Sequence, residues 1–290
     1  MSETNADRPM RGIIMILGAV FCFTLSDAMA KWLGQAMPAT QLNWIRYVVF
    51  VPFALVLVAH TAGGRMRVAQ PRMQVARGLL LAVSALMYVM AIQTMPLAEA
   101  NAVGFVSPLL ITALSVLVLG EVVRAPRWAA IAVGLLGVLV IVRPGTAAFQ
   151  PAALLVVASS AAWAVAVVLT RRMAGHDPTA TTLLWSAVVG LVTMTAVLPF
   201  GWTWPGPADW ALGIALGLVA SAGQYLMVQA YRFASASLLA PFSYSSLLWS
   251  TLLGWALFGA LPDRWTLVGA AVIVAAGLVA ARPDRKSEPQ

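Results

Sequence analysis

Two ionisable residues interrupt long apolar stretches of the sequence. Asp27 lies in the apolar run 12–33, and Arg46 lies in the run 41–60. A charged side chain at the centre of a membrane helix costs about 2.5–3.5 kcal/mol on insertion scales, so such residues pair or mark a pathway for substrate or protons. Counted along helices at about 1.5 Å per residue, the two lie at similar depth. We predict either a structural ion pair or a pair that meets a charged substrate or a proton.

Larger polar and aromatic side chains within the apolar runs are the candidate substrate-binding residues. An amide, indole or phenol that faced lipid would lack a hydrogen-bond partner, so these groups are expected to face a polar interior. Serine and threonine hydroxyls are less informative, because they also serve plain helix packing. The candidates are Tyr88, Asn101, Trp163, Gln224, Tyr225 and Tyr244.

Two prolines lie in the middle of apolar runs, where they would bend a helix. Pro108 and Pro241 each lack the N–H that a helix needs, which predicts kinks near residues 104 and 237. The carbonyl groups freed at such kinks can line a cavity or bind a substrate ammonium group. Together with Gly104, the two prolines are predicted hinges, and a static kink that serves packing is the alternative.

The sequence lacks the residues of several other chemistries. One cysteine, Cys22, excludes an intramolecular disulfide, a cysteine-based zinc site and an iron–sulfur cluster. His60 and His176 are too few for a metal or haem site, and no G-x-x-x-x-G-K-[ST] motif is present for ATP hydrolysis. We expect no catalytic residue, no metal and no cofactor. An intramembrane enzyme, a passive assembly subunit and a channel are the weaker alternatives, and a channel is disfavoured by the lack of charge rings.

Composition places these residues in a membrane. The 290 residues are 61% hydrophobic and 10% charged, with a mean hydropathy of +0.87, whereas soluble proteins are about 45–50% apolar and about 25% charged. The runs are continuous, which favours helices over the alternating pattern of a barrel, and a helical span needs about 20 apolar residues. We predict an all-α integral membrane protein with ten transmembrane helices: 12–33, 41–60, 74–95, 98–119, 126–143, 151–171, 179–199, 208–230, 235–258 and 265–282.

The basic residues predict how the chain is oriented. With ten spans, both tails and every second loop lie on one side, and that side carries fourteen of the eighteen Lys and Arg residues. The opposite side has Lys31, Arg143 and Arg264. Because cytoplasmic loops are enriched in Lys and Arg, both termini are predicted to be cytoplasmic.

The second half of the sequence repeats the first at a near-constant offset. Phe23 corresponds to Trp163 and Lys31 to Arg171, and Arg143-Pro144 corresponds to Arg282-Pro283. The first run therefore has a counterpart and is expected to be retained rather than cleaved as a signal peptide. Five spans per copy give the second copy the reverse orientation, which is typical of secondary transporters that work by alternating access. The predicted units are the tail 1–10, the repeats 11–144 and 145–283, and the tail 284–290.

Several short motifs recur at matching places of the two halves or punctuate the spans: Gly12…Gly18-Ala19…Phe23, Ala161-Ala162-Trp163, Pro108-Leu109-Leu110 through Leu119-Gly120-Glu121, and the Arg-Pro that ends each repeat. With these motifs the sequence resembles the EamA-type group of the drug/metabolite transporter superfamily. The second half departs from the pattern, since Gly259-Ala260 lacks the glutamate and Pro241 comes earlier than Pro108 would predict. The resemblance implies an exporter of amino acids, including aromatic ones, or of other small metabolites. It also implies a cavity lined by spans 1, 3, 4, 6, 8 and 9, with spans 5 and 10 peripheral.

The predicted protein is thus a multi-pass secondary transporter of the bacterial inner membrane with a central cavity. A polyanionic cargo would need several buried cations, and only Arg46 is available as one. The alternative cargo is a multidrug or quaternary ammonium cation, held by Asp27, Trp163 and Tyr225 through charge and cation–π contact. The expected partners are lipid, a small-molecule substrate and protons; neither nucleic acid nor an obligate protein partner is indicated.

Overall fold

The computed structural model describes residues 7–61, 68–119, 125–173, 177–234 and 236–280, and within these ranges the chain is helical with no strand. Gly120-Glu121, His176 and Arg282-Pro283, on which some of the sequence analysis rests, lie outside the described residues. The elements are α1 (Asp7–Leu33), α2 (Ala39–Thr61), α3 (Pro71–Thr94), α4 (Leu97–Gly104), α5 (Ser107–Leu119), α6 (Ala125–Val142), α7 (Ala152–Met173), α8 (Thr179–Val197), η1 (Leu198–Phe200), α9 (Pro207–Phe233), α10 (Ala236–Ser243), α11 (Ser245–Phe258) and α12 (Arg264–Ala280).

Local sequence signals account for several helix ends. Pro71 and Pro207 are the first residues of α3 and α9, a position where the missing N–H costs nothing. The Asp209 side chain accepts a hydrogen bond from the Gly206 N–H at 3.2 Å and so caps α9. Gly259 ends α11 with φ 63°, a left-handed conformation that favours glycine.

Two apolar segments are broken near their middles. Phe105 and Val106 separate α4 from α5, beside the kink predicted at residue 104, and Tyr244 separates α10 from α11. The kink predicted near residue 237 is wrong, because α10 continues through Pro241 as far as Ser243. Pro241 is the sixth residue of α10, and the single hydrogen bond that it lacks, to the carbonyl oxygen of residue 237, leaves the helix unbroken as far as Ser243. The two observed breaks, at Phe105 and Tyr244, fall at corresponding positions of the two repeats.

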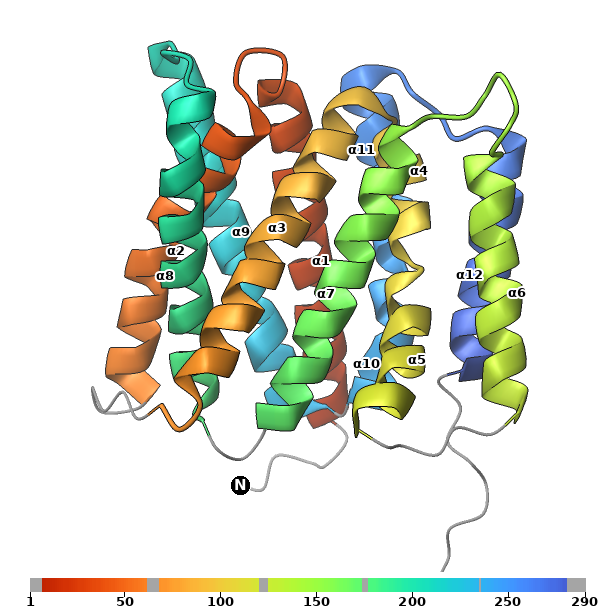
Figure 1. The fold of residues 1–290 in the computed structure, drawn as a ribbon, viewed down its shortest axis with the longest axis horizontal. Helices are drawn as coiled ribbons and strands as arrows, with labels where there is room; N and C mark the ends of the chain where they lie inside the picture. The colour runs from red at the N-terminus through yellow and green to blue at the C-terminus, as the bar shows by residue number, and fades with distance from the viewer. Residues whose placement is uncertain (1–6, 62–67, 120–124, 174–176, 235, 281–290) are drawn as a thin grey trace, which may run out of the picture.

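The helices of the two halves pack by one scheme. Helix α1 packs against α9 as α7 packs against α3, and α2 packs against α9 as α8 packs against α3. Helices α2 and α8 pair at one edge of the bundle and α6 and α12 at the other (Figure 1). If each helix is replaced by the corresponding helix of the other half, the same set of contacting pairs results. The structure therefore contains two like units that are related by a pseudo-twofold axis.

Figure 1 also shows how the two units are threaded. Helix α1 begins, and α12 ends, at the lower end of the bundle, which we call the terminal end; α7 begins at the upper end, which we call the opposite end (Figure 1). The second unit thus runs in the reverse direction to the first.

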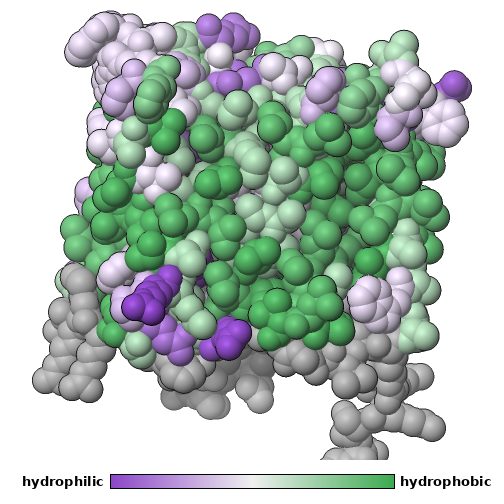
Figure 2. Space-filling view, viewed as in Figure 1, coloured by the Kyte–Doolittle hydropathy of each residue, from purple (hydrophilic) through white to green (hydrophobic). Residues whose placement is uncertain are grey.

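The outer surface is suited to lipid. Seven helical segments are long and apolar enough to cross a membrane, and α6 and α12 contain shorter apolar helices. Figure 2 shows a broad apolar band between more polar ends of the molecule. Large aliphatic side chains in this surface are well exposed, including Val192 at 63% and Leu136 at 59%. Exposed apolar area of this extent is stable only against lipid.

Candidate functional site

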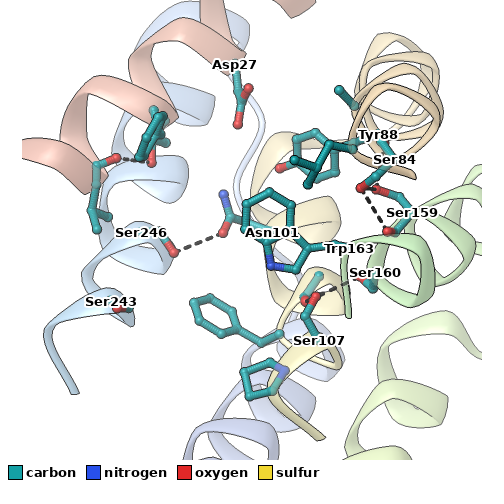
Figure 3. A pocket seen from close by; sticks show the side chains of 18 of the residues that line it. Asp27, Ser84, Tyr88, Asn101, Ser107, Ser159, Ser160, Trp163, Ser243 and Ser246 are labelled. Atoms are coloured by element: carbon teal, nitrogen blue, oxygen red, sulfur yellow. Dashed lines mark hydrogen bonds between the residues drawn. The ribbon is translucent and has the colours of Figure 1, made fainter. Parts of the chain in front are cut away.

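A cavity of about 420 Å³ lies in the middle of the bundle, between the two units. Its lining comes from α1, α3, α4, α5 and the break between α4 and α5 in the first unit, and from α7, α9, α10 and α11 in the second (Figure 3). Among the described residues, α2, α6, α8 and α12 contribute nothing to the lining. Side chains from both repeats therefore face one shared space.

The lining combines aromatic rings and hydroxyl groups with a single charge. Asp27 is the one charged residue among the described lining residues, and Asn101 is the one amide. Seven Ser and Thr residues add hydroxyl groups, among them Thr24 and Ser243. The aromatic side chains are Phe23, Tyr88, Phe105 and Trp163. This composition suits a small molecule that carries a ring and a positive charge.

Asp27 and Arg46 form an ion pair at the wall of the cavity. Arg46 Nη2 lies 3.2 Å from Asp27 Oδ1, and it also donates a hydrogen bond to Ser26 Oγ at 3.0 Å. Ser26 Oγ in turn donates to the Leu216 carbonyl oxygen on α9, at 3.2 Å. This chain of contacts connects α2, α1 and α9. Asp27 Oδ2 receives no hydrogen bond from the described residues, and the Asp27 side chain points into the cavity (Figure 3).

The two units also meet at the cavity through Asn101 and the helix breaks. Ser246 Oγ on α11 donates a hydrogen bond to Asn101 Oδ1 on α4, at 3.0 Å (Figure 3). The rings of Phe105 and Tyr244 pack with their centroids 4.8 Å apart. Because each of these rings belongs to the break in its own unit, the pseudo-twofold axis passes between them.

Serines satisfy the carbonyl group that the first break frees. The Gly104 carbonyl oxygen accepts hydrogen bonds from Ser107 Oγ at 2.7 Å and from Ser160 Oγ at 3.4 Å. Nearby, Ser84 and Ser159 bond each other's carbonyl oxygens at 2.9 and 2.8 Å, which joins α3 to α7. The carbonyl at this break is therefore bound to protein hydroxyls rather than left open for a substrate ammonium group.

The structure brings most of the predicted site residues together, but not all. Those that line the cavity are Asp27, Tyr88, Asn101, Gly104, Pro108 and Trp163. Arg46 contacts Asp27 from outside the lining, and Tyr244 contacts Phe105 in the same way. Gln224 and Tyr225, on α9, and Pro241, on α10, are not lining residues. Tyr225 is 43% exposed and packs edge-on against Phe53 of α2, away from the cavity.

Sequence reasoning missed Phe105 and Ser246 as candidate site residues. Both line the cavity, and both contact candidates that were recognised, namely Tyr244 and Asn101. A signal for Phe105 was available, because it aligns with Tyr244 when the second repeat is laid on the first. Ser246 carried no such signal, since a serine in a membrane helix is usually a packing residue.

The opposite end of the bundle is closed. Side chains from the end of α1 to the start of α4 pack there in one apolar cluster, and each is at most 2% exposed: Leu33, Met37, Ile92, Met95 and Leu97. Arg143 Nη1 and Asp263 Oδ2 form an ion pair at 2.7 Å between the connection after α6 and the one before α12. Slight burial raises the pKa of Asp263, but the Thr266 N–H and the Arg143 guanidinium outweigh it, so the net pKa is lowered.

No group of three or more potential ligands for a metal ion occurs among the residues that the structure describes.

Two like units that run in opposite directions around a central cavity are an arrangement typical of membrane transporters with inverted repeats. The chain belongs to the EamA-like transporter family, which it matches over residues 10–143 and 150–282. The resemblance predicted from the sequence is confirmed at the level of the family. The protein is accordingly a multi-pass membrane transporter of the bacterial inner membrane.

Related proteins of known role transport several kinds of metabolite. The chain is 26% identical to an S-adenosylmethionine uptake transporter of Rickettsia prowazekii (strain Madrid E), over 96% of this chain and 95% of that one. It is 29% identical to a riboflavin transporter of Rhizobium johnstonii, over 99% and 98%. It is 28% identical to a pseudopaline exporter of Pseudomonas aeruginosa, over 94% and 97%. These relatives include both uptake and export proteins, and none of the three is named as an amino-acid exporter.

A solved protein structure shares the fold. It matches with a TM-score of 0.65 at 24% identity, over 93% of this chain and 96% of the other.

Proposed function

We propose that the protein is a secondary transporter that moves small metabolites by alternating access through the central cavity. The observation that carries the proposal is the shared cavity itself, into which Asp27 from one unit and Trp163 from the other both point (Figure 3). A volume of about 420 Å³ falls within the range of about 300–1,000 Å³ that small-molecule sites occupy.

The proposed substrates are amino acids and amino-acid-like metabolites that carry an aromatic ring. Their ammonium or other cationic group would meet Asp27 Oδ2, and their ring would pack against Trp163 and Tyr88. Asn101 Nδ2 has no hydrogen-bond acceptor among the described residues, so it is available to a substrate carboxylate. The S-adenosylmethionine that related proteins take up combines the same three features: a ring, a positive charge and an amino-acid group.

The proposed direction is export, and the proposed topology has ten crossings with both termini in the cytoplasm. The broken segments α4–α5 and α10–α11 each count as one crossing, and α6 and α12 complete the ten. The excess of Lys and Arg at the terminal end supports a cytoplasmic location for that end. Because the opposite end is closed, the described conformation would load substrate from the cytoplasm.

Export of quaternary ammonium cations is the second candidate, and one observation favours it. Asp27 is the one charge among the described lining residues, and the aromatic rings beside it suit a hydrophobic cation. Tyr225 no longer supports this proposal, because it lies outside the cavity.

A transport assay in proteoliposomes tests both candidates. Vesicles that contain the purified protein would be offered tyrosine, phenylalanine, S-adenosylmethionine, riboflavin and tetraphenylphosphonium, with and without a proton gradient. We expect saturable movement of the cationic or zwitterionic aromatic solutes. Preference for tetraphenylphosphonium would select the second candidate, and movement of none of these solutes would contradict both.

A further inference from the structure

The ammonium group of Lys31, on α1, contacts two other helices at the closed opposite end. Lys31 Nζ, near the end of α1, donates hydrogen bonds to the carbonyl oxygens of Ile92 at 2.7 Å and Met95 at 2.8 Å. Helix α3 ends at Thr94, so Ile92 lies in its last turn and Met95 is the C-cap residue, and carbonyl groups at these positions lack intrahelical donors. Lys31 Nζ also lies 5.4 Å from the centroid of the Phe258 ring on α11. The contact therefore joins α1 to α3 in the first unit and to α11 in the second.

The second unit has a cation at the corresponding place, but without these contacts. Arg171 is the counterpart of Lys31 in the repeat, and each is the third residue from the end of its helix, α7 and α1 respectively. Helix α9, which ends at Phe233, corresponds to α3. The Arg171 side chain is exposed, and no hydrogen bond joins it to the residues of α9 that the structure describes.

This difference between the units concerns the two ends of the bundle. The main contacts of the same helices are alike in the two units, since α1 contacts α9 as α7 contacts α3, and α1 contacts α11 as α7 contacts α5. At the opposite end, α1 also packs against α3, whereas α7 and α9 make no comparable contact within the described chain. The closed end thus differs from the terminal end in the contact that Lys31 makes.

We propose that Lys31 and Arg171 are alternating latches of the transport cycle. In the described conformation Lys31 holds the opposite end closed by binding the last carbonyls of α3. When that end opens, Arg171 binds the last carbonyls of α9 and closes the terminal end. The proposal rests on the alternating access of the proposed function and adds the two residues that stabilise its end states.

The chemistry of helix ends supports a cation in both places. The last four carbonyl groups of a helix lack intrahelical donors and carry a partial negative charge, so Lys and Arg bind there favourably. A hydrogen bond from a charged donor contributes more than a neutral one. A latch of this kind still releases, because the freed ammonium or guanidinium group returns to the interfacial water near its helix end.

Cysteine reactivity at the two ends tests the proposal. In a Cys22→Ala background, Leu97→Cys reports on the opposite end, where Leu97 is 1% exposed, and Ser243→Cys reports on the cavity. Alkylation by a polar maleimide would be timed in nanodiscs, where the reagent reaches both faces. The result then depends neither on the orientation of the chain nor on the identity of the substrate.

We expect Lys31→Met to speed alkylation at Leu97→Cys by about tenfold or more, since it removes two charge-assisted hydrogen bonds from the closed state. The same variant should slow alkylation at Ser243→Cys, because opening one end closes the other. Lys31→Arg should stay within about twofold of the wild type, since Arg can bind the same carbonyls. Arg171→Met should slow alkylation at Leu97→Cys and, when combined with Lys31→Met, should reverse part of its effect.

Three results would overturn the proposal. Lys31→Met could change neither rate, it could raise both rates as general loosening would, or Arg171→Met could speed alkylation at Leu97→Cys. Failure of the proposed function would show differently, as absence of solute movement in proteoliposomes while the labelling pattern still switched.

Discussion

The two carboxylate oxygens of Asp27 have different surroundings: one is bound to a protein side chain, and the other faces the cavity. Oδ1 is bound to Arg46, whereas Oδ2 has no donor among the described residues, and the side chain is 18% exposed at the cavity wall. A purely structural ion pair would not need an oxygen that faces a cavity. The position of Asp27 therefore favours a role in binding a substrate cation or a proton. From the sequence alone, this role and a purely structural one were both open.

We predict that Asp27→Asn selectively impairs transport of positively charged and zwitterionic solutes. The amide keeps the size of the side chain but removes the one charge that a substrate ammonium group meets in the described lining. A charged hydrogen bond contributes about 1.5–3 kcal/mol, so the apparent affinity should fall by about tenfold or more. Transport should be measured from pH 5.5 to 8.5, with Asp209→Asn, a helix-cap residue outside the cavity lining, as the control. Transport equal to wild type at every pH would exclude both a substrate and a proton role for Asp27.

Trp163 allows a second test at the level of the residue. It is 47% exposed and lines the cavity, so the ring is free to stack on a substrate. Aromatic pairs contribute about 0.5–1.5 kcal/mol, and we expect Trp163→Leu to weaken binding of aromatic substrates by about threefold to tenfold. Trp163→Phe should retain most of the binding. Trp255, which is 58% exposed and outside the lining, provides Trp255→Leu as the matched control. Equal effects of the two leucine variants would argue against stacking.

Sequence reasoning selected residues whose type alone makes lipid exposure costly. Asp27, Asn101 and Trp163 were predicted on that basis, and they line the cavity. Tyr225 was predicted on the same basis but faces outward against Phe53, because a tyrosine can place its ring against apolar neighbours and its hydroxyl group elsewhere. The direction that a side chain faces depends on helix rotation, which short polar stripes in an apolar sequence do not fix.

At the level of the helices, two glycines allow close crossings between the units. A Cβ atom on Gly78 of α3 would lie 2.7 Å from Val189 Cβ of α8, and one on Gly217 of α9 would lie 2.7 Å from Val49 Cβ of α2. These pairs are related by the repeat, since Val189 is the counterpart of Val49 at the same offset that relates Arg171 to Lys31. The close approach of α3 to α8 is therefore repeated by α9 and α2.

We predict that Gly78→Val and Gly217→Val each lower the melting temperature of the purified protein. The added side chain must push two helices apart, and overpacking of this kind costs about 1–3 kcal/mol. A second substitution that removes volume from the partner, Val189→Ala or Val49→Ala respectively, should restore part of the loss. Gly104→Ala is the control, because its nearest neighbour would be Val156 Cγ1 at 3.9 Å, an ordinary contact. If Gly104→Ala destabilised as much as Gly78→Val, crowding would not be the cause.

The helix breaks show what sequence can and cannot predict about elements. Pro108 predicted an interruption near residue 104, and the chain breaks at Phe105 and Val106. Pro241 predicted one near residue 237, yet the chain breaks at Tyr244, where the ring packs on Phe105. In the second unit the position of the break follows the pseudo-symmetry of the fold rather than the position of the proline. An alignment of the two repeats was the better guide.

For the whole molecule, the repeat in the sequence predicted two like units but did not predict that one end of the bundle is closed. Corresponding positions at a near-constant offset indicated two like units, and the helices pack as two like units. Which end is closed could not be predicted, because the repeat places like residues, such as Lys31 and Arg171, at corresponding positions of the two ends. The apolar cluster at the opposite end and the hydrogen bonds of Lys31 belong to the one arrangement that is described, and the proposed alternating access would require a second.

The Arg143–Asp263 ion pair predicts an effect of acid on the closed opposite end. The pKa of Asp263 in the folded protein is lowered below 3.8, with burial opposing and the hydrogen bonds from Thr266 and Arg143 outweighing it. A carboxylate with a lowered pKa stabilises the closed end above its ordinary pKa, and this stabilisation is lost as the pH falls through the lowered value. Because the Asp263 side chain is 41% exposed, the effect should be small and should weaken with salt.

We expect alkylation at Leu97→Cys, followed with an acid-tolerant thiol reagent, to rise below about pH 4 in the wild type at low ionic strength. Asp263→Asn should show the raised rate already at neutral pH and should lose this dependence, whereas Asp177→Asn, whose carboxylate bonds Gln74 at the terminal end, should keep it. An acid response that persisted in Asp263→Asn would assign it to another group at the closed end.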